Sequence, residues 1–444
     1  MIPGILQLFI IVQTTNNPDL IRSKAPKTAK EITPGNIEPD VLILKNSVPL
    51  YMIVAGSQPI VRMDIIFRAG TWWQHRPLVA TSAIAMLTEG TAGSSSKEIA
   101  EKLDYNGAYL ITSADRDNAF VTVYFLEKYM DIILPLLAEI VKEPAFPREE
   151  FLAYRERRKQ NFLIEKTRVS NLAREMFALA IYGPEHPYGQ TFSCSDFDSL
   201  KPEDLSEFYS RYFHSKNCRI IVSGNYNQTM LASRIGELFG GDWGSFGKIS
   251  DTKKEKKPSP KRQIFVPRSG AVQSAIRIGR ETFTRSHPDY PGMLVLNNLL
   301  GGHFGSRLMQ NIREKKGYTY GIGSALVTLR NSGYLVIVSE VGTSYRKKSL
   351  KEIYRELDKL CSKPVSKREL ELTRTQMLGE LLRDFDGPFA RAESIRNLLE
   401  HDLDTGFYKK IISTIRSIGP SELLDLSARY LSPGSMYEVV AGSE

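Results

Sequence analysis

Two residues of the C-terminal half, Arg313 and Tyr320, could act together on one carbonyl group. A glycine-rich loop at 301–305 leads into a short amphipathic segment, which we expect to be helical and to end at Gly317, before a strand. Arg313 would then lie on the last helical turn and Tyr320 on the strand, seven residues further along. A guanidinium and a phenol held in this way could donate hydrogen bonds to the same oxygen. The pattern also fits a surface arginine and a half-buried strand tyrosine.

The composition is that of an ordinary soluble globular protein, with 42% hydrophobic and 25% charged residues. A net charge of +9 is spread thinly over 59 basic and 50 acidic residues, so it does not indicate a nucleic-acid partner. The densest basic run, at 253–262, favours a solvated linker over an anion-binding patch. The cysteines are odd in number and far apart, so neither a disulfide framework nor a zinc knuckle is predicted from Cys194, Cys218 and Cys361.

The first residues carry a short apolar run at 5–12. Eight residues cannot span a bilayer, no basic residue precedes them, and no clean cleavage site follows. The sequence therefore predicts neither a membrane span nor a convincing signal peptide. The location stays open between the cytoplasm and the periplasm.

The chain repeats itself. Residues 208–225 and 426–444 both contain an Arg-Tyr pair that leads into an apolar strand, and the two pairs lie 218 residues apart. Upstream, the alternating segment 60–68 resembles 272–280 at an offset of 212. Two ordered matches at nearly one spacing predict an internal duplication.

Each half begins with an alternating strand and continues with a helix, further strands and long helices. This mixture indicates an α+β protein, in which each half forms an antiparallel sheet covered by helices on one face. The predicted divisions are an N-terminal extension, an N-terminal domain, a linker and a C-terminal domain, at 1–35, 36–244, 245–262 and 263–444.

Six landmarks occur in a characteristic order: Phe67-Arg68-Ala69-Gly70-Thr71, Met86 to Thr91, Ser96 to Leu103, His186-Pro187-Tyr188-Gly189, Phe208 to Asn225, and Ser306 to Tyr320. In this order they resemble the pitrilysin, insulinase and mitochondrial-processing-peptidase family of zinc peptidases, over about residues 42–444. The resemblance implies two homologous domains arranged as one half of a clam-shell. It also implies that the metal motif and the Arg/Tyr pair can lie on different subunits.

Active members of that family carry His-x-x-Glu-His on the first helix, where it binds zinc and supplies the general base. Aligned on residues 86–91, the corresponding positions hold Thr81, Ile84 and Ala85. None of the six histidines has a second histidine within ten residues or a glutamate three residues later, so no such motif exists in this chain. We expect the chain to bind no metal and to have no autonomous peptidase activity. A zinc site built from distant histidines is the alternative.

The resemblance implies that Arg313 and Tyr320 bind peptide and stabilise the transition state at the zinc site of a homologous partner subunit in a heterodimer. Unfolded peptides would be the substrate. The strand after 104–108 would bind them by β-addition. Substrate handling would also involve the loop residues Gly301, Gly302, His303 and Gly305. The alternative is an inactive homologue that serves as a peptide-binding or structural scaffold, with the Arg/Tyr pair as a relic. Self-association is compatible with either.

Overall fold

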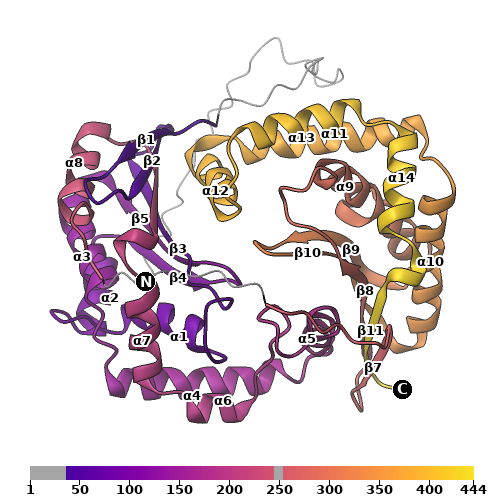
Figure 1. Ribbon diagram of the computed structural model, residues 1–444, viewed down its shortest axis with the longest axis horizontal. Coiled ribbons are helices and arrows are strands. Elements are labelled where there is room, and N and C mark those ends of the chain that lie inside the picture. Colours follow the sequence, from indigo (N-terminus) through magenta and orange to yellow (C-terminus); the bar gives the residue numbers. More distant parts are fainter. Residues whose placement is uncertain (1–36, 245–253) are drawn as a thin grey trace, which may run out of the picture. The chain divides into compact units, whose positions relative to one another are not determined.

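The computed structural model describes residues 37–244 and 254–444 (Figure 1). The predicted N-terminal extension and the first part of the predicted linker lie outside these residues. Within the two described ranges, the helices are too short or too polar to cross a bilayer. The chain is an α+β protein built on two sheets, as the sequence predicted.

The N-terminal half folds around a six-stranded sheet with the strand order β1-β2-β6-β3-β5-β4. Its strands are β1 (Asp40–Ile43), β2 (Pro49–Val54), β3 (Ile60–Phe67), β4 (Tyr109–Ala114), β5 (Ala119–Leu126) and β6 (Cys218–Gly224). The helices of this half that share its main core are α1 (Val79–Ala85), α2 (Ser96–Tyr105), α3 (Met130–Lys142), α4 (Arg148–Glu165), α6 (Cys194–Ser199), α7 (Pro202–Tyr212) and α8 (Gln228–Phe239). Every second residue of β3, from Val61 to Phe67, enters this core, as the period of a strand requires.

The C-terminal half folds around a five-stranded sheet with the strand order β7-β11-β8-β10-β9. Its strands are β7 (Gln263–Pro267), β8 (Gln273–Glu281), β9 (Thr319–Thr328), β10 (Gly333–Gly342) and β11 (Tyr437–Gly442). The helices that cover one face are α9 (Tyr290–Asn297), α10 (Arg346–Ser362), α11 (Lys367–Asp384), α13 (Gly406–Ser417) and α14 (Pro420–Tyr430).

The two sheets share one topology, since β2-β6-β3-β5-β4 has the same order and pairing directions as β7-β11-β8-β10-β9. The segments predicted to be equivalent form β3 with β8 and β6 with β11. One detail of the prediction needs correction: neither sheet is wholly antiparallel, because β2 pairs with β6, and β7 with β11, in parallel. The last strand of each half returns after a long helical connection, and it enters between β2 and β3 in the first sheet and between β7 and β8 in the second. A parallel pair requires a long crossover of this kind.

The second face of each sheet is partly covered by a helix from the other half. Helix α5 (Val169–Tyr182) packs on β8 and β11, and α12 (Gly387–Glu400) packs on β2 and β6. On the first sheet, Ile395 and Leu398 of α12 are buried against Ile66 and Ile221. Each such side chain contributes about 1.5–3 kcal/mol when it is fully buried. The predicted coverage of one face alone was therefore incomplete.

A charge cluster at the end of α12 also joins the halves. The carboxylate of Asp402 forms ion pairs with Arg68 at 2.6 Å, Arg219 at 2.8 Å and Arg330 at 2.6 Å. Burial alone would raise the pKa of Asp402, but the hydrogen bonds from Arg219 and Arg330 outweigh it and hold that pKa at about 2. The carboxylate thus stays charged and connects β6 with the turn between β9 and β10.

Candidate functional site

Arg313 lies on a π-helix, Met309–Lys315, that packs against β9. Ile312 is buried and anchors this segment on the second core. Gly317 has φ +65° and donates its N–H to the carbonyl of Arg313 at 3.0 Å, so the helix ends where the sequence predicted. The wider π-type winding was not predicted, because local sequence rarely distinguishes it from an α-helix.

The guanidinium of Arg313 lies over the ring of Phe304, 4.6 Å from its centroid. This cation–π contact holds the side chain without consuming its N–H donors. Across the described residues, no carboxylate forms an ion pair with Arg313. The side chain is half-buried, so its donors remain available to a group from outside the chain.

Tyr320 is the second residue of β9, and its side chain is 93% exposed. The alternative of a half-buried strand tyrosine is therefore wrong. Tyr320 lines a surface hollow of about 510 Å³ together with Arg277, Glu340 and Ser170. Its hydroxyl has no hydrogen-bond partner in the part of the chain that the structure describes, so it too can act only on something external.

The two elements that hold Arg313 and Tyr320 lie side by side, because the π-helix packs on β9. The structure does not bring the two donor groups to one hollow, since Arg313 is absent from the lining of the Tyr320 hollow. Arg277 is a neighbour of Tyr320 that the sequence interpretation missed. The available signal was a charged residue between Ile276 and Ile278, within an apolar strand. Burial lowers the pKa of Arg277, and nearby Arg174 lowers it further.

The residues of the glycine-rich loop 301–305 do not share one site: some line hollows on the surface, and one packs against β9. Gly301 packs against β9 so closely that a Cβ atom there would lie 2.5 Å from the backbone nitrogen of Ser324. His303 places Nδ1 at 3.0 Å from the carbonyl oxygen of Asn298. His303 and Gly305 line a second hollow, whereas Gly302 lines a third. The loop is thus not gathered around Tyr320.

Helix α1 carries Thr81, Ile84 and Ala85, the positions that the resemblance aligns with the zinc-binding motif His-x-x-Glu-His. The hydroxyl of Thr81 donates to the carbonyl of Leu78 at 3.1 Å, Ile84 is buried, and Ala85 packs against the first core. Alkyl groups and one occupied hydroxyl do not fit Zn²⁺, which takes nitrogen, sulfur or carboxylate ligands. Over residues 37–244 and 254–444, histidine, cysteine and acidic side chains form no cluster of three or more suited to a metal ion.

Strand β4 is one of the two edge strands of the first sheet, as expected for a peptide-binding edge. Along it, Tyr109 is 65% and Ile111 39% exposed, and Tyr105 just before it is 90% exposed. The backbone edge that does not pair with β5 can accept an added strand.

Two family models match the chain. Residues 84–185 match "Insulinase (Peptidase family M16)", and residues 199–377 match "Peptidase M16 inactive domain". YmxG of Bacillus subtilis, described as an uncharacterized zinc protease, is 23% identical over 304 residues, covering 67% of this chain and 72% of that protein. The probable inactive metalloprotease YmfF of the same organism is 25% identical over 276 residues, covering 59% of this chain and 62% of that protein.

A solved structure has the same fold. It is described as a peptidase M16 inactive domain from Pseudomonas fluorescens and superposes with a TM-score of 0.80 at 22% sequence identity. The superposition covers 91% of this chain and 98% of the other, so the likeness extends across both sheets.

Proposed function

Because the chain belongs to the M16 family of peptidases, we propose that it is the non-catalytic subunit of a heterodimeric zinc metallopeptidase. It would supply Arg313 and Tyr320 to a zinc site on a homologous partner that carries His-x-x-Glu-His. The observation that carries this proposal is a contrast within one chain. Helix α1 offers no metal ligands, whereas Arg313 on the π-helix and Tyr320 on β9 have no hydrogen-bond acceptor among the residues that the structure describes.

The two donors would act electrostatically. As the scissile carbonyl gains negative charge, a guanidinium and a phenol aimed at its oxygen stabilise the transition state more than the ground state. One donor of this kind is typically worth about 3 kcal/mol, or roughly a hundredfold in rate. No step of the hydrolysis is assigned to a metal on this chain, because the α1 side chains do not fit one.

Substrate binding would use the edge of β4. An extended peptide can add there through main-chain hydrogen bonds, which require little sequence selectivity. The exposed aromatic side chains of Tyr105 and Tyr109 would cover part of its length. This supports unfolded peptides as the substrate class.

Co-purification of the chain with its native partner, followed by a peptidase assay, tests the proposal. Arg313→Ala and Tyr320→Phe should each lower kcat of the complex by about a hundredfold while leaving assembly intact. Tyr345→Phe is the matched control, because this tyrosine is 41% exposed but lies in the turn that joins β10 to α10. A partner with full activity on its own, or equal activity of the Tyr320 and Tyr345 variants, would rule the proposal out.

A structural or peptide-binding scaffold is the second candidate. It is favoured by the separation of Arg313 from the Tyr320 hollow, and by the similarity to a relative described as probably inactive. It predicts stable complexes whose peptidase activity is indifferent to both substitutions. Stoichiometric zinc in the purified chain would contradict both candidates.

A further inference from the structure

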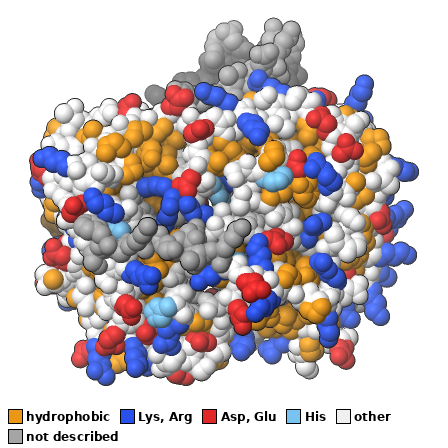
Figure 2. Space-filling view, in the orientation of Figure 1, with side chains coloured by type: hydrophobic (Ala, Val, Ile, Leu, Met, Phe, Trp, Pro, Cys, Tyr) orange, Lys and Arg blue, Asp and Glu red, His pale blue; other side chains and the backbone are white. Residues whose placement is uncertain are grey.

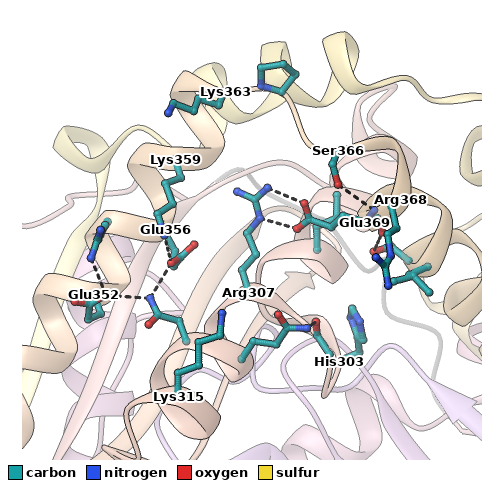
Figure 3. Close-up of a pocket in the computed structure, with 18 of the residues that line it drawn as sticks. His303, Arg307, Lys315, Glu352, Glu356, Lys359, Lys363, Ser366, Arg368 and Glu369 are labelled. Atoms are coloured by element: carbon teal, nitrogen blue, oxygen red, sulfur yellow. Dashed lines mark hydrogen bonds and ion pairs between the residues drawn. The ribbon is translucent and has the colours of Figure 1, made fainter.

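A hollow of about 980 Å³ lies between the π-helix, the C-terminal half of α10 and the first turn of α11 (Figure 3). Seven lysine and arginine side chains and three glutamates line it, which gives a net charge of +4. On the face drawn in Figure 2, basic side chains gather along the margin where α10 lies. The hollow is thus more basic than the thin spread of charge in the sequence suggested.

The three glutamates are already engaged by neighbours. Glu369 accepts two hydrogen bonds from Arg307, at 2.7 and 2.9 Å. Glu356 accepts from Lys359 at 2.6 Å, and the amide of Asn311 reaches both Glu356 and Glu352, at 2.7 and 3.0 Å. The negative charge of the hollow is therefore held in internal pairs (Figure 3).

Three cations remain. Lys315, Lys363 and Arg368 are exposed and form no ion pair with any described residue. They come from three different segments, the π-helix, the end of α10 and the start of α11, and they border the hollow from separate sides (Figure 3). Cations without partners around one concave surface repel each other, and a bound anion would relieve that repulsion.

The N-terminus of α11 adds to the positive potential. Ser366 and Arg368, at the beginning of this 18-residue helix, both line the hollow. The Ser366 hydroxyl accepts the N–H of Glu369 at 3.2 Å. The other N–H groups of the first turn have no acceptor within the helix, and the helix dipole favours negative charge nearby.

We propose that this hollow binds a compact multivalent oxyanion of the polyphosphate class. Its volume suits a small ligand, and lysine ammonium groups bind phosphate oxygens as point charges. No phenylalanine, tyrosine or tryptophan occurs among the described residues that line it, and the imidazole of His303, which does line it, has Nδ1 at 3.0 Å from the carbonyl oxygen of Asn298. A lining of charged groups with one small aromatic ring favours a bare oligophosphate over a nucleotide.

The hollow is separate from the face that carries Arg313. Asn311 and Lys315 line it and lie four residues apart on the π-helix, whereas Arg313 falls midway between them. A residue two positions away lies on the opposite side of a helix. The anion site therefore does not depend on the function proposed above.

Isothermal titration of the purified full chain with sodium tripolyphosphate tests the proposal. A triple variant (Lys315→Gln, Lys363→Gln, Arg368→Gln) should bind at least about tenfold more weakly than the parent chain. The control is Lys347→Gln, Lys351→Gln and Lys367→Gln, which removes the same charge from exposed positions on α10 and α11 that do not line the hollow. The control should retain parental affinity, and both variants should keep the parental thermal midpoint without ligand.

Three results would overturn the proposal. They are the absence of tripolyphosphate binding at low salt, an equal loss of affinity in the two variants, and tighter binding of ATP than of tripolyphosphate. The second would mean attraction to net charge alone. The third would mean that the hollow selects a nucleotide.

Discussion

Glu400, at the end of α12, provides the sharpest test of how the two halves are held together. The pKa of this carboxyl is raised from 4.5 to about 7, chiefly by burial and next by neighbouring Asp115, while Arg396 opposes the shift. Glu393 and Arg285 also face it, with effects of opposite sign. Between pH 4.5 and 7 the native state therefore binds more protons than the unfolded chain. The free energy of unfolding must fall as pH rises through this window.

The magnitude follows from that shift. One pKa unit corresponds to about 1.4 kcal/mol, so ionised Glu400 costs the native state about 3 kcal/mol above pH 7. Glu400→Gln resembles the protonated side chain. At pH 5 the variant should be about as stable as the parent chain, and at pH 8 it should be more stable by up to about 3 kcal/mol.

Urea unfolding followed by circular dichroism at pH 5 and pH 8 measures this difference directly. Glu207→Gln, at an exposed position of α7, is the control for loss of one negative charge. If the stability difference between Glu400→Gln and the parent is the same at both pH values, the reasoning about Glu400 is refuted.

Two further substitutions test the packing. Leu398→Ala, at a side chain 2% exposed between α12 and the first sheet, should lower the free energy of unfolding by about 2–4 kcal/mol in the same urea assay. A loss below about 1 kcal/mol would mean that α12 is not firmly docked. Gly301→Ala should cost about 1–3 kcal/mol, because the added methyl would meet the backbone of Ser324. Gly434→Ala, where no atom lies near the added methyl, is its control and should change little.

Much of the fold could be predicted because it follows from local sequence patterns, namely the alternation of apolar residues and the glycines that end helices. The alternation at 60–67 and its repeat at 273–281 produce the strands β3 and β8. The apolar residues of β3 from Val61 to Phe67 are buried as expected, but its polar residues Arg62 and Asp64 are buried as well. The helix ending at Gly317 was predictable because few other residues adopt a positive φ without strain. The duplication then extended each local prediction to the other half.

The exchange of α5 and α12 could not be predicted in the same way. Their apolar residues show that each helix covers something, but periodicity does not say which sheet it covers. The orientation of Arg313 depends on a contact with Phe304, nine residues away on a preceding loop. The basic hollow likewise combines residues of three segments, none of which is unusual alone. These features arise from tertiary packing and leave no local signal.

The exchanged helices have a consequence for biosynthesis. Strands β2 to β6 have all been synthesised once residue 224 has been made, yet the face that α12 covers stays exposed until about residue 400 follows. At about 5–20 residues per second, Ile66 and Ile221 would wait some tens of seconds for their cover. Chaperones would be expected to bind this exposed apolar face of the nascent N-terminal half. A transcript truncated at the linker would yield a fragment that keeps the face exposed and is therefore prone to aggregate.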